Sequence, residues 1–207
     1  MNRIGVVLFV LSLAACGIRE DRSNYEPIID KTKLQEGDLV FRLGRGTSSQ
    51  IVYRADRDRA YSHIGILVKD SVGEWYVIHA VPGESAETGG VEVLKCDPLL
   101  LFFGYDRTVR GAVVRFEAMD DIAEQVISKT WEYYDRQPLF DHNYLLSDST
   151  VLYCTELVYR AFLSAGVDLT EGRRHAMPLL KEAVIFPSDI LRNDGLWEVS
   201  PVKFVER

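Results

Sequence analysis

Runs of lysine and arginine are absent from this sequence, and its 24 basic residues are outnumbered by 31 acidic ones. A nucleic-acid partner is therefore not expected. Cysteine is scarce as well, and the three cysteines, at positions 16, 96 and 154, are spaced like neither a disulfide framework nor a zinc knuckle. No apolar run is long enough to cross a membrane as a helix. Hydrophobic residues still make up 47% of the 207 residues, which indicates one globular domain with a full core.

The N-terminus has the pattern of a targeting segment. A short positive start is followed by ten apolar residues, 4–13, and then by Leu13-Ala14-Ala15-Cys16. The last four residues resemble a bacterial lipobox, which implies cleavage of residues 1–15 as a signal peptide and acylation of Cys16. The alternative is an ordinary secretory signal that is cut at a nearby small residue. Glycine follows Cys16 where an inner-membrane retention aspartate would stand, so we expect a lipid anchor in the outer membrane, facing the periplasm.

Residues 16–33 are polar and predict a tether, and residues 34–207 predict a single α+β domain. Alternation of apolar and polar residues, bounded by turn residues, indicates strands, and apolar residues at helical spacing indicate helices. The stretch 34–44 is expected to be a turn at Gly37-Asp38 that leads into a strand. The other expected strands are 62–68, 75–81, 91–95, 111–116 and an edge strand at 197–205; the expected helices are 48–53, 120–136, 154–165 and a last turn from 186.

Two histidines lie on the predicted hairpin of strands 62–68 and 75–81. His63 and His79 are on the same face of the sheet if the strands are antiparallel. A turn centred on Ser71 would place the two histidines directly opposite one another, with Cβ atoms about 4.5–5.5 Å apart. A turn centred half a residue later would break that pairing, and the sequence leaves both registers open. A histidine on a strand is also commonly a structural residue.

Cys154 opens an amphipathic helix. Leu157, Val158 and Ala161 follow it at helical spacing, and residues 148–150 are expected to cap the helix. A thiol at a helix N-terminus faces the positive end of the dipole, which favours the thiolate that nucleophilic catalysis needs. Cys154 is therefore the expected reactive thiol, in contrast to Cys96. The alternative is a buried free cysteine that packs as a small hydrophobic residue.

Thiol catalysis of acyl transfer also needs a base for the thiol proton, a group that orients the base, and donors for the oxyanion. His63 and His79 are the candidates for the first two roles. The other histidines, at 142 and 175, lie in polar loops. A metal site made by the two strand histidines and Cys154 is not expected, because ligands from such distant segments lack a recognisable spacing.

The motifs taken together resemble the YiiX-like branch of the NlpC-type cysteine peptidases. The matching stretches are Gly37-Asp38-Leu39-Val40-Phe41, Ser62-His63-Ile64-Gly65-Ile66, Asp141-His142-Asn143-Tyr144, Tyr153-Cys154-Thr155-Glu156-Leu157-Val158 and, more weakly, Phe186-Pro187-Ser188-Asp189. The resemblance rests on their order and spacing from residue 34 to about 162. It implies a circularly permuted papain-like fold, in which an antiparallel sheet or barrel packs on helices and the nucleophile helix follows the sheet.

The resemblance also implies roles for these residues. Cys154 would be the nucleophile and His63 the general base, and the third group belongs on the next strand, where His79 stands. A carboxylate or another polar residue is expected there, so Glu84 and Glu92 are alternatives to His79. Tyr153 is expected either to bind substrate or help the oxyanion beside the nucleophile, or to pack the first turn. No metal and no other cofactor is implied.

The expected activity is hydrolysis of an amide bond through a thioester intermediate, with murein peptides as the substrate class of the relatives. A second hypothesis is an acyltransferase or lipid hydrolase that uses the same cysteine and histidine. For that hypothesis the apolar run 99–103 would line an acyl pocket, or else it belongs to the core. A third hypothesis is a catalytically silent binding lipoprotein, against which the presence of all three candidate side chains argues.

Overall fold

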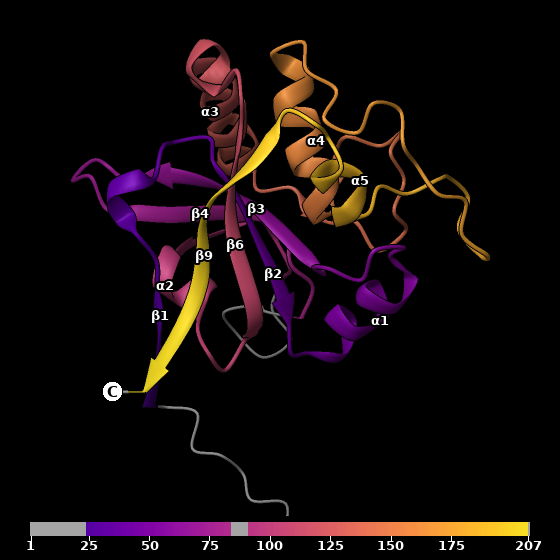
Figure 1. Cartoon of the computed structure of the whole chain (residues 1–207). Coiled ribbons are helices and arrows are strands. Elements are labelled where there is room, and N and C mark those ends of the chain that lie inside the picture. Colours follow the sequence, from indigo (N-terminus) through magenta and orange to yellow (C-terminus); the bar gives the residue numbers. More distant parts are fainter. Residues whose placement is uncertain (1–23, 84–90, 207) are drawn as a thin grey trace, which may run out of the picture.

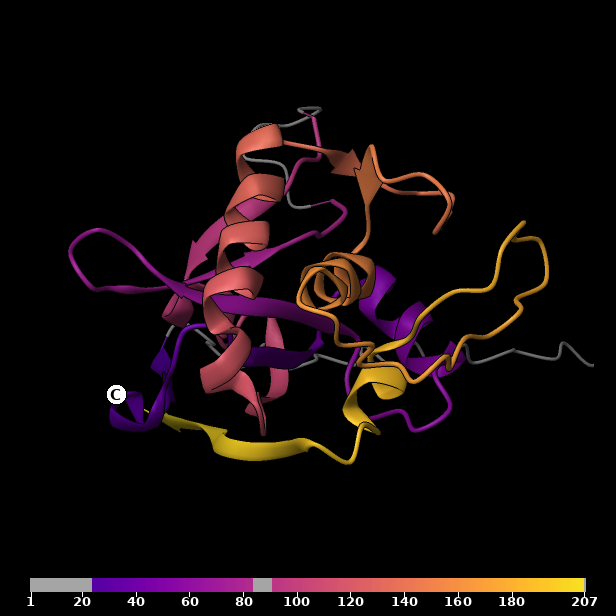
Figure 2. The ribbon, with the colours of Figure 1, turned by 90° about the horizontal axis from the view of Figure 1, so that it is seen from above.

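A seven-stranded antiparallel sheet organises the computed structural model, which describes residues 24–83 and 91–206. The sheet curls into a half-barrel that packs against helices, as the expected α+β class requires (Figures 1 and 2). The strand order is β1-β9-β6-β2-β3-β4-β5. The strands are β1 (Tyr25–Ile28), β2 (Leu39–Gly44), β3 (His63–Lys69), β4 (Trp75–His79), β5 (Lys95–Pro98), β6 (Thr108–Phe116) and β9 (Leu196–Glu206).

The helices lie in the connections between these strands. A two-stranded parallel sheet precedes α4. Helices α3 and α4 are neighbours whose axes cross steeply, since Figure 2 shows α3 along its length and α4 nearly end-on (Figures 1 and 2). Among the described residues no helix is both long and apolar enough to cross a membrane. The helices are α1 (Thr47–Ala55), α2 (Leu99–Phe102), α3 (Met119–Arg136), α4 (Cys154–Ser164) and α5 (Pro187–Leu191), with a short 3-10 turn η2 (Lys31–Lys33); the small sheet pairs β7 (Leu139–Phe140) with β8 (Val151–Leu152).

Three strand predictions differ from the structure. Residues 25–28, within the expected tether, form β1 and pair antiparallel with β9, so the folded domain begins before residue 34. Consequently β9 lies between β1 and β6 rather than at the edge. The strand expected at 91–95 begins only at Lys95, because Glu92 and Val93 turn aside to bond the β7 backbone. The signal peptide 1–15 and Cys16 lie outside the described residues.

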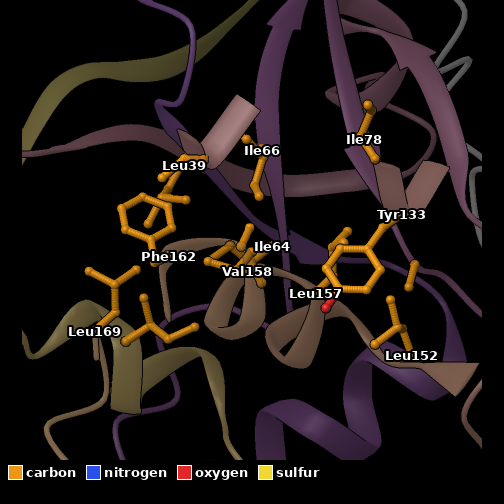
Figure 3. Packing of buried hydrophobic residues seen from close by; sticks show 14 of the residues in the cluster. Leu39, Ile64, Ile66, Ile78, Tyr133, Leu152, Leu157, Val158, Phe162 and Leu169 are labelled. Carbon is orange, nitrogen blue, oxygen red and sulfur yellow. The ribbon is translucent and has the colours of Figure 1, made fainter. Parts of the chain in front are cut away.

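The core has two parts, one on each face of the sheet. The larger cluster joins β2, β3 and β4 to α3 and α4, and in Figure 3 Leu157 and Val158 of α4 lie against Ile64 of β3. The smaller cluster lies on the opposite face and is covered by α2, whose Leu99 and Phe102 are buried. Of the run 99–103, Leu99, Phe102 and Phe103 therefore belong to the core, whereas Leu100 and Leu101 are exposed. The alternation of apolar side chains along the strands supplies both clusters.

Candidate active site

The β3–β4 hairpin brings His63 and His79 together by a register that differs from direct opposition. Ile66 pairs with Ile78 and Lys69 with Trp75, so the turn is centred on Val72, one residue later than the direct pairing of the histidines requires. His79 therefore faces Gly65, and His63 lies two positions further along the same face. A Cβ atom on Gly65 would come within 3.0 Å of the His79 Cβ atom. The missing side chain leaves the His79 ring room to reach His63.

The two imidazoles form a hydrogen-bonded chain that ends on a carboxylate. Nε2 of His63 lies 2.9 Å from Nδ1 of His79, and Nε2 of His79 lies 3.3 Å from Oδ2 of Asp97. All three side chains are buried. An ionised carboxylate only accepts hydrogen bonds, so a neutral His79 carries its proton on Nε2 and accepts from His63 at Nδ1. His63 then carries its proton on Nε2, and the lone pair of its Nδ1 can accept a proton.

Asp97 is the member of this chain that the sequence did not reveal. It lies on β5, where it pairs with Val77 while Lys95 pairs with His79. Burial raises the pKa of Asp97, but the His79 hydrogen bond and the charges of His79, Lys95 and Arg107 outweigh it, so the pKa is lowered overall. Asp97 is therefore ionised at neutral pH. A strand predicted at 95–98 and paired with 75–79 would have placed Asp97 near His79.

An apolar ring and an arginine define the surroundings of His63. The ring of Phe102 stacks on His63 at 5.7 Å and meets the His79 ring edge-on at 5.0 Å. Arg42 on β2 pairs directly with His63 across the sheet, and its NH1 donates to the carbonyl of Phe102 at 2.7 Å. Burial, with smaller effects of Arg42 and His79, holds the pKa of His63 well below its usual value. His63 is therefore neutral at pH 7, the form in which it can accept a proton.

Helix α4 begins at Cys154 itself, and its N-terminus carries no side-chain cap. The residue before the helix is Tyr153, and the expected caps are wrong, because Asp148 bonds the backbone and hydroxyl of Thr150 instead. Backbone N–H groups of Thr155 and Cys154, from the first turn, act on the sulfur. A further backbone N–H comes from Ile64, the residue after His63. The sulfur is thus held beside the backbone of the histidine strand.

The expected thiolate is not the resting form of Cys154. Burial raises the pKa of Cys154 to about 11, and this outweighs the lowering by the N–H groups of Ile64, Thr155 and Cys154 and by the charge of Arg42. The first-turn N–H groups lower the pKa, in the direction that the position at a helix N-terminus predicts, but they do not offset burial. The resting pair is a neutral thiol and a neutral imidazole. Such a thiol needs a general base at the moment of attack.

Cys154 lies where two pockets meet. The larger, of about 490 Å³, is also lined by His63 and by the arginines Arg42, Arg45 and Arg107. The smaller, of about 250 Å³, lies between α1 and the segment 177–187 and has apolar walls. A nucleophile at the junction of two pockets can meet a substrate whose two halves differ in polarity.

Tyr153 lines both pockets but is almost completely buried. Its hydroxyl accepts a hydrogen bond from the backbone N–H of Ile185 at 3.3 Å, and burial raises its pKa. These contacts favour the packing role over a direct role at the oxyanion. Tyr144, the last residue of the Asp-His-Asn-Tyr motif, also lines both pockets, and its ring centre lies 5.1 Å from that of Tyr153. Its backbone φ of 55° is held by the loop that Asp141 organises.

The remaining polar candidates lie away from the sulfur. Glu92 pairs with His142 at 2.7 Å and accepts from the backbone of Gly83, so its carboxylate is already engaged. Glu84 lies outside the described residues. His175 pairs with Asp189 of the Phe-Pro-Ser-Asp motif. Over residues 24–83 and 91–206, no group of three or more His, Cys, Asp and Glu side chains is arranged to hold a metal ion.

The two described cysteines should differ in their response to the charge of an alkylating reagent. Burial raises the pKa of both Cys96 and Cys154 to about 11, so labelling of each by neutral iodoacetamide should rise about tenfold per pH unit below that value. Arg42 attracts an anion to Cys154, whereas Asp97 and Asp70 repel it from Cys96. The iodoacetate-to-iodoacetamide rate ratio should therefore be at least about threefold higher at Cys154. Peptide mass mapping measures both rates, and a higher ratio at Cys96 would contradict this electrostatic picture.

Comparison with known proteins finds a likeness in fold. No family model matches the chain, and no curated protein does either. The chain is similar to the crystal structure of the metalloprotein yiiX from Escherichia coli O157:H7, with a TM-score of 0.64 and 20% sequence identity. The match covers 84% of this chain and 98% of that one. The chain therefore has a YiiX-like fold, and at this identity the likeness extends to the fold alone.

Proposed function

We propose that this protein is a cysteine hydrolase that cleaves an amide bond through a thioester, on a permuted papain-like version of the YiiX-like fold. The observation that carries the proposal is the chain from His63 through His79 to Asp97, which leaves Nδ1 of His63 as a base at the strand that holds the Cys154 sulfur. A general base, a group that orients it and a nucleophile at a helix N-terminus are the parts that thiol catalysis needs.

The proposed reaction proceeds in two steps. His63 accepts the thiol proton as the Cys154 sulfur attacks the carbonyl carbon, and the same proton is then given to the leaving nitrogen. The uncapped first turn of α4 directs backbone N–H groups towards the reacting centre, where negative charge develops on the oxygen. His63 next deprotonates a water that hydrolyses the thioester. His79, fixed by Asp97, stabilises the imidazolium formed in each step.

Murein peptides are the substrate class that the sequence resemblance suggests, and acyl transfer to an acceptor other than water is the second candidate. The apolar pocket beside Cys154 supports the second candidate, because an acyl group on the sulfur could lie in it. We would incubate the full chain with murein peptides and N-acyl amino acids and identify the products by mass spectrometry, with Cys154→Ala as the control. Amide cleavage supports hydrolysis, and acyl exchange supports the second candidate. Lack of turnover with every substrate would instead favour a binding lipoprotein.

The yiiX structure is described as that of a metalloprotein, which raises the question of a metal site in this chain. In the described residues no group of three or more His, Cys, Asp and Glu side chains is arranged to hold a metal ion. The ring nitrogens of His63 and His79 that face each other are hydrogen-bonded at 2.9 Å. Lone pairs that bind one metal ion must converge on a common point, whereas these two nitrogens are directed at each other. No step of the proposed mechanism uses a metal.

We also propose that the protein is anchored in the outer membrane by lipids on Cys16. The Leu-Ala-Ala-Cys motif that closes the apolar run supports this. Mass spectrometry of the membrane fraction should find an acylated cysteine at a new N-terminus, with at least two acyl chains, because one chain binds membranes only marginally. An unmodified N-terminus at any other residue would refute the anchor.

A further inference from the structure

Arg107 joins the larger pocket to the hydrogen-bonded chain behind His63. Its NH1 atom lies 3.6 Å from Oδ2 of Asp97, and its side chain also lines the larger pocket. Neither Asp97 nor His79 lines that pocket. A group bound in the larger pocket can therefore act on the far end of the chain through the side chain of Arg107.

Oδ2 of Asp97 is shared between one hydrogen-bond donor and two cations. Nε2 of His79 lies 3.3 Å away, and Nζ of Lys95 and NH1 of Arg107 each lie 3.6 Å away. An N–H···O hydrogen bond is usually about 2.7–3.2 Å long, so the bond from His79 is a long one. The two cations also oppose the positive charge that the imidazole chain acquires when His63 accepts a proton. Both effects make His63 a weaker base than it would be if His79 alone bonded the carboxylate oxygen.

The backbone of Arg107 is fixed, whereas its guanidinium can move. The Arg107 N–H donates to the carbonyl of Gly104, and the Arg107 carbonyl accepts from the N–H of Arg45, both at 2.9 Å. The Arg107 side chain is 29% exposed, and its contact with Asp97 is longer than a hydrogen bond. Asp106, a second acidic neighbour at 3.8 Å, is exposed to solvent, which screens its charge. An anion that accepted hydrogen bonds directly from the guanidinium would compete well with both carboxylates.

The larger pocket suits such an anion. Of the described residues that line it, Arg42, Arg45 and Arg107 are basic and Asp106 is acidic, and an excess of positive charge in a cleft concentrates anions. His63, which gives the proton to the leaving nitrogen in the proposed reaction, lines the same pocket. The amine half of the substrate therefore lies in the larger pocket. A carboxylate on that half would match the planar guanidinium of Arg107, which can donate two parallel hydrogen bonds to it.

We propose that Arg107 is a positioning residue that makes the reaction depend on the charge of the substrate. A carboxylate on the amine half draws the guanidinium away from Asp97, the hydrogen bond from His79 to Asp97 tightens, and His63 becomes a stronger base. The inference rests on the proposed hydrolase function and names its substrate class: amides whose amine half carries an anionic group. Lys95 lies at the same distance from Oδ2 of Asp97 but does not line the pocket, so it still holds Asp97 when Arg107 turns away.

The test observes the proton on Nε2 of His79 by NMR at pH 7, in the full chain with Cys154→Ser so that neither probe is turned over. A hydrogen-bonded proton resonates further downfield as its bond shortens, and loss of the signal in His79→Gln assigns it. N-acetylglycine, whose carboxylate is ionised at this pH, should move the resonance downfield. N-acetylglycinamide, which has nearly the same shape without the charge, should leave the resonance in place.

Two variants at the same carboxylate oxygen separate the effect of the pocket from the effect of charge. Arg107→Gln and Lys95→Gln each remove one cation from Oδ2 of Asp97, so each should move the resonance downfield without any probe. The Lys95→Gln chain should still respond to N-acetylglycine, whereas the Arg107→Gln chain should not. An equal response of the two variants would overturn the coupling. The expected responses without turnover by the wild-type protein would support the coupling and count against the hydrolase proposal alone.

Turnover provides a second measurement on any amide that the protein cleaves. At pH 7, kcat for the amide with a free carboxylate on its amine half should exceed kcat for the corresponding carboxamide at least about threefold. Arg107→Gln should bring this ratio close to one, and Lys95→Gln should preserve it. A merely structural role of Arg107 would lower both rates together, so an unchanged ratio in Arg107→Gln would refute the proposal.

Discussion

Replacing Cys154 or His63 with alanine should each lower kcat by at least about 10³-fold on any amide that the protein cleaves. Loss of the sulfur removes the nucleophile. Loss of the imidazole leaves a thiol whose pKa is about 11, so that only about one molecule in 10⁴ is a thiolate at pH 7. The double variant should be no slower than either single variant, because the two groups act as one unit.

This experiment needs a control for folding, because both residues lie near the core. Cys154→Ser keeps the shape of the side chain, and a matched Cys96→Ser variant changes the other described cysteine, which is outside the two pockets. Cys96→Ser should keep full activity. Raising the pH towards 11 should partly restore the rate of His63→Ala, since the thiolate then forms without a base. Full activity of His63→Ala at neutral pH would refute the mechanism.

The second large effect concerns the residues that orient His63. His79→Ala should lower kcat by about 10- to 100-fold, less than His63→Ala, because the base is still present but its tautomer and ring position are no longer fixed. His79→Gln offers a side-chain oxygen that can accept from Nε2 of His63, so it should recover part of the loss. Combining His63→Ala with His79→Ala should be no worse than His63→Ala alone.

Asp97→Asn tests the end of the same chain. An asparagine oxygen can still accept from His79 but carries no charge, so the imidazolium formed during catalysis loses a stabilising partner. We expect a loss of kcat of about tenfold, with KM little changed. Glu92→Gln is the matched control, because Glu92 pairs with the exposed His142. If Glu92→Gln were damaging and His79→Ala silent, the orienting role would pass to Glu92.

Local signals in the sequence were sufficient for most elements of the fold. Periodicity located β3, β4, α3 and α4 to within a few residues, because each carries a clear apolar face. The hairpin register was not predictable, since it depends on the turn geometry, in which Gly73 adopts a φ of 88° and shifts the centre to Val72. A shift of one residue in the turn moves the partner of His79 by two positions.

Long-range contacts account for the parts of the site that the sequence did not reveal. Asp97 lies near His79 because β5 pairs with β4, and this pairing joins segments that no local pattern connects. The protonation state of Cys154 depends on burial by segments distant in the chain, which outweighs the helix dipole that a local pattern indicates. The apolar pocket likewise needs α1 and the segment 177–187 to meet, and no local pattern encodes that meeting.

The position of β9 has a consequence for how the chain reaches its native state. β9 is the last strand, yet it pairs with both β1 and β6, so the first strand has no partner until the last residues are available. Bringing together two ends about 180 residues apart costs roughly 4–5 kcal/mol of chain entropy before any contact compensates for it. Such non-local pairing makes folding slow. A chain cut before residue 196 would leave β1 without a partner strand and β6 as an open sheet edge. An open edge is a site for aggregation.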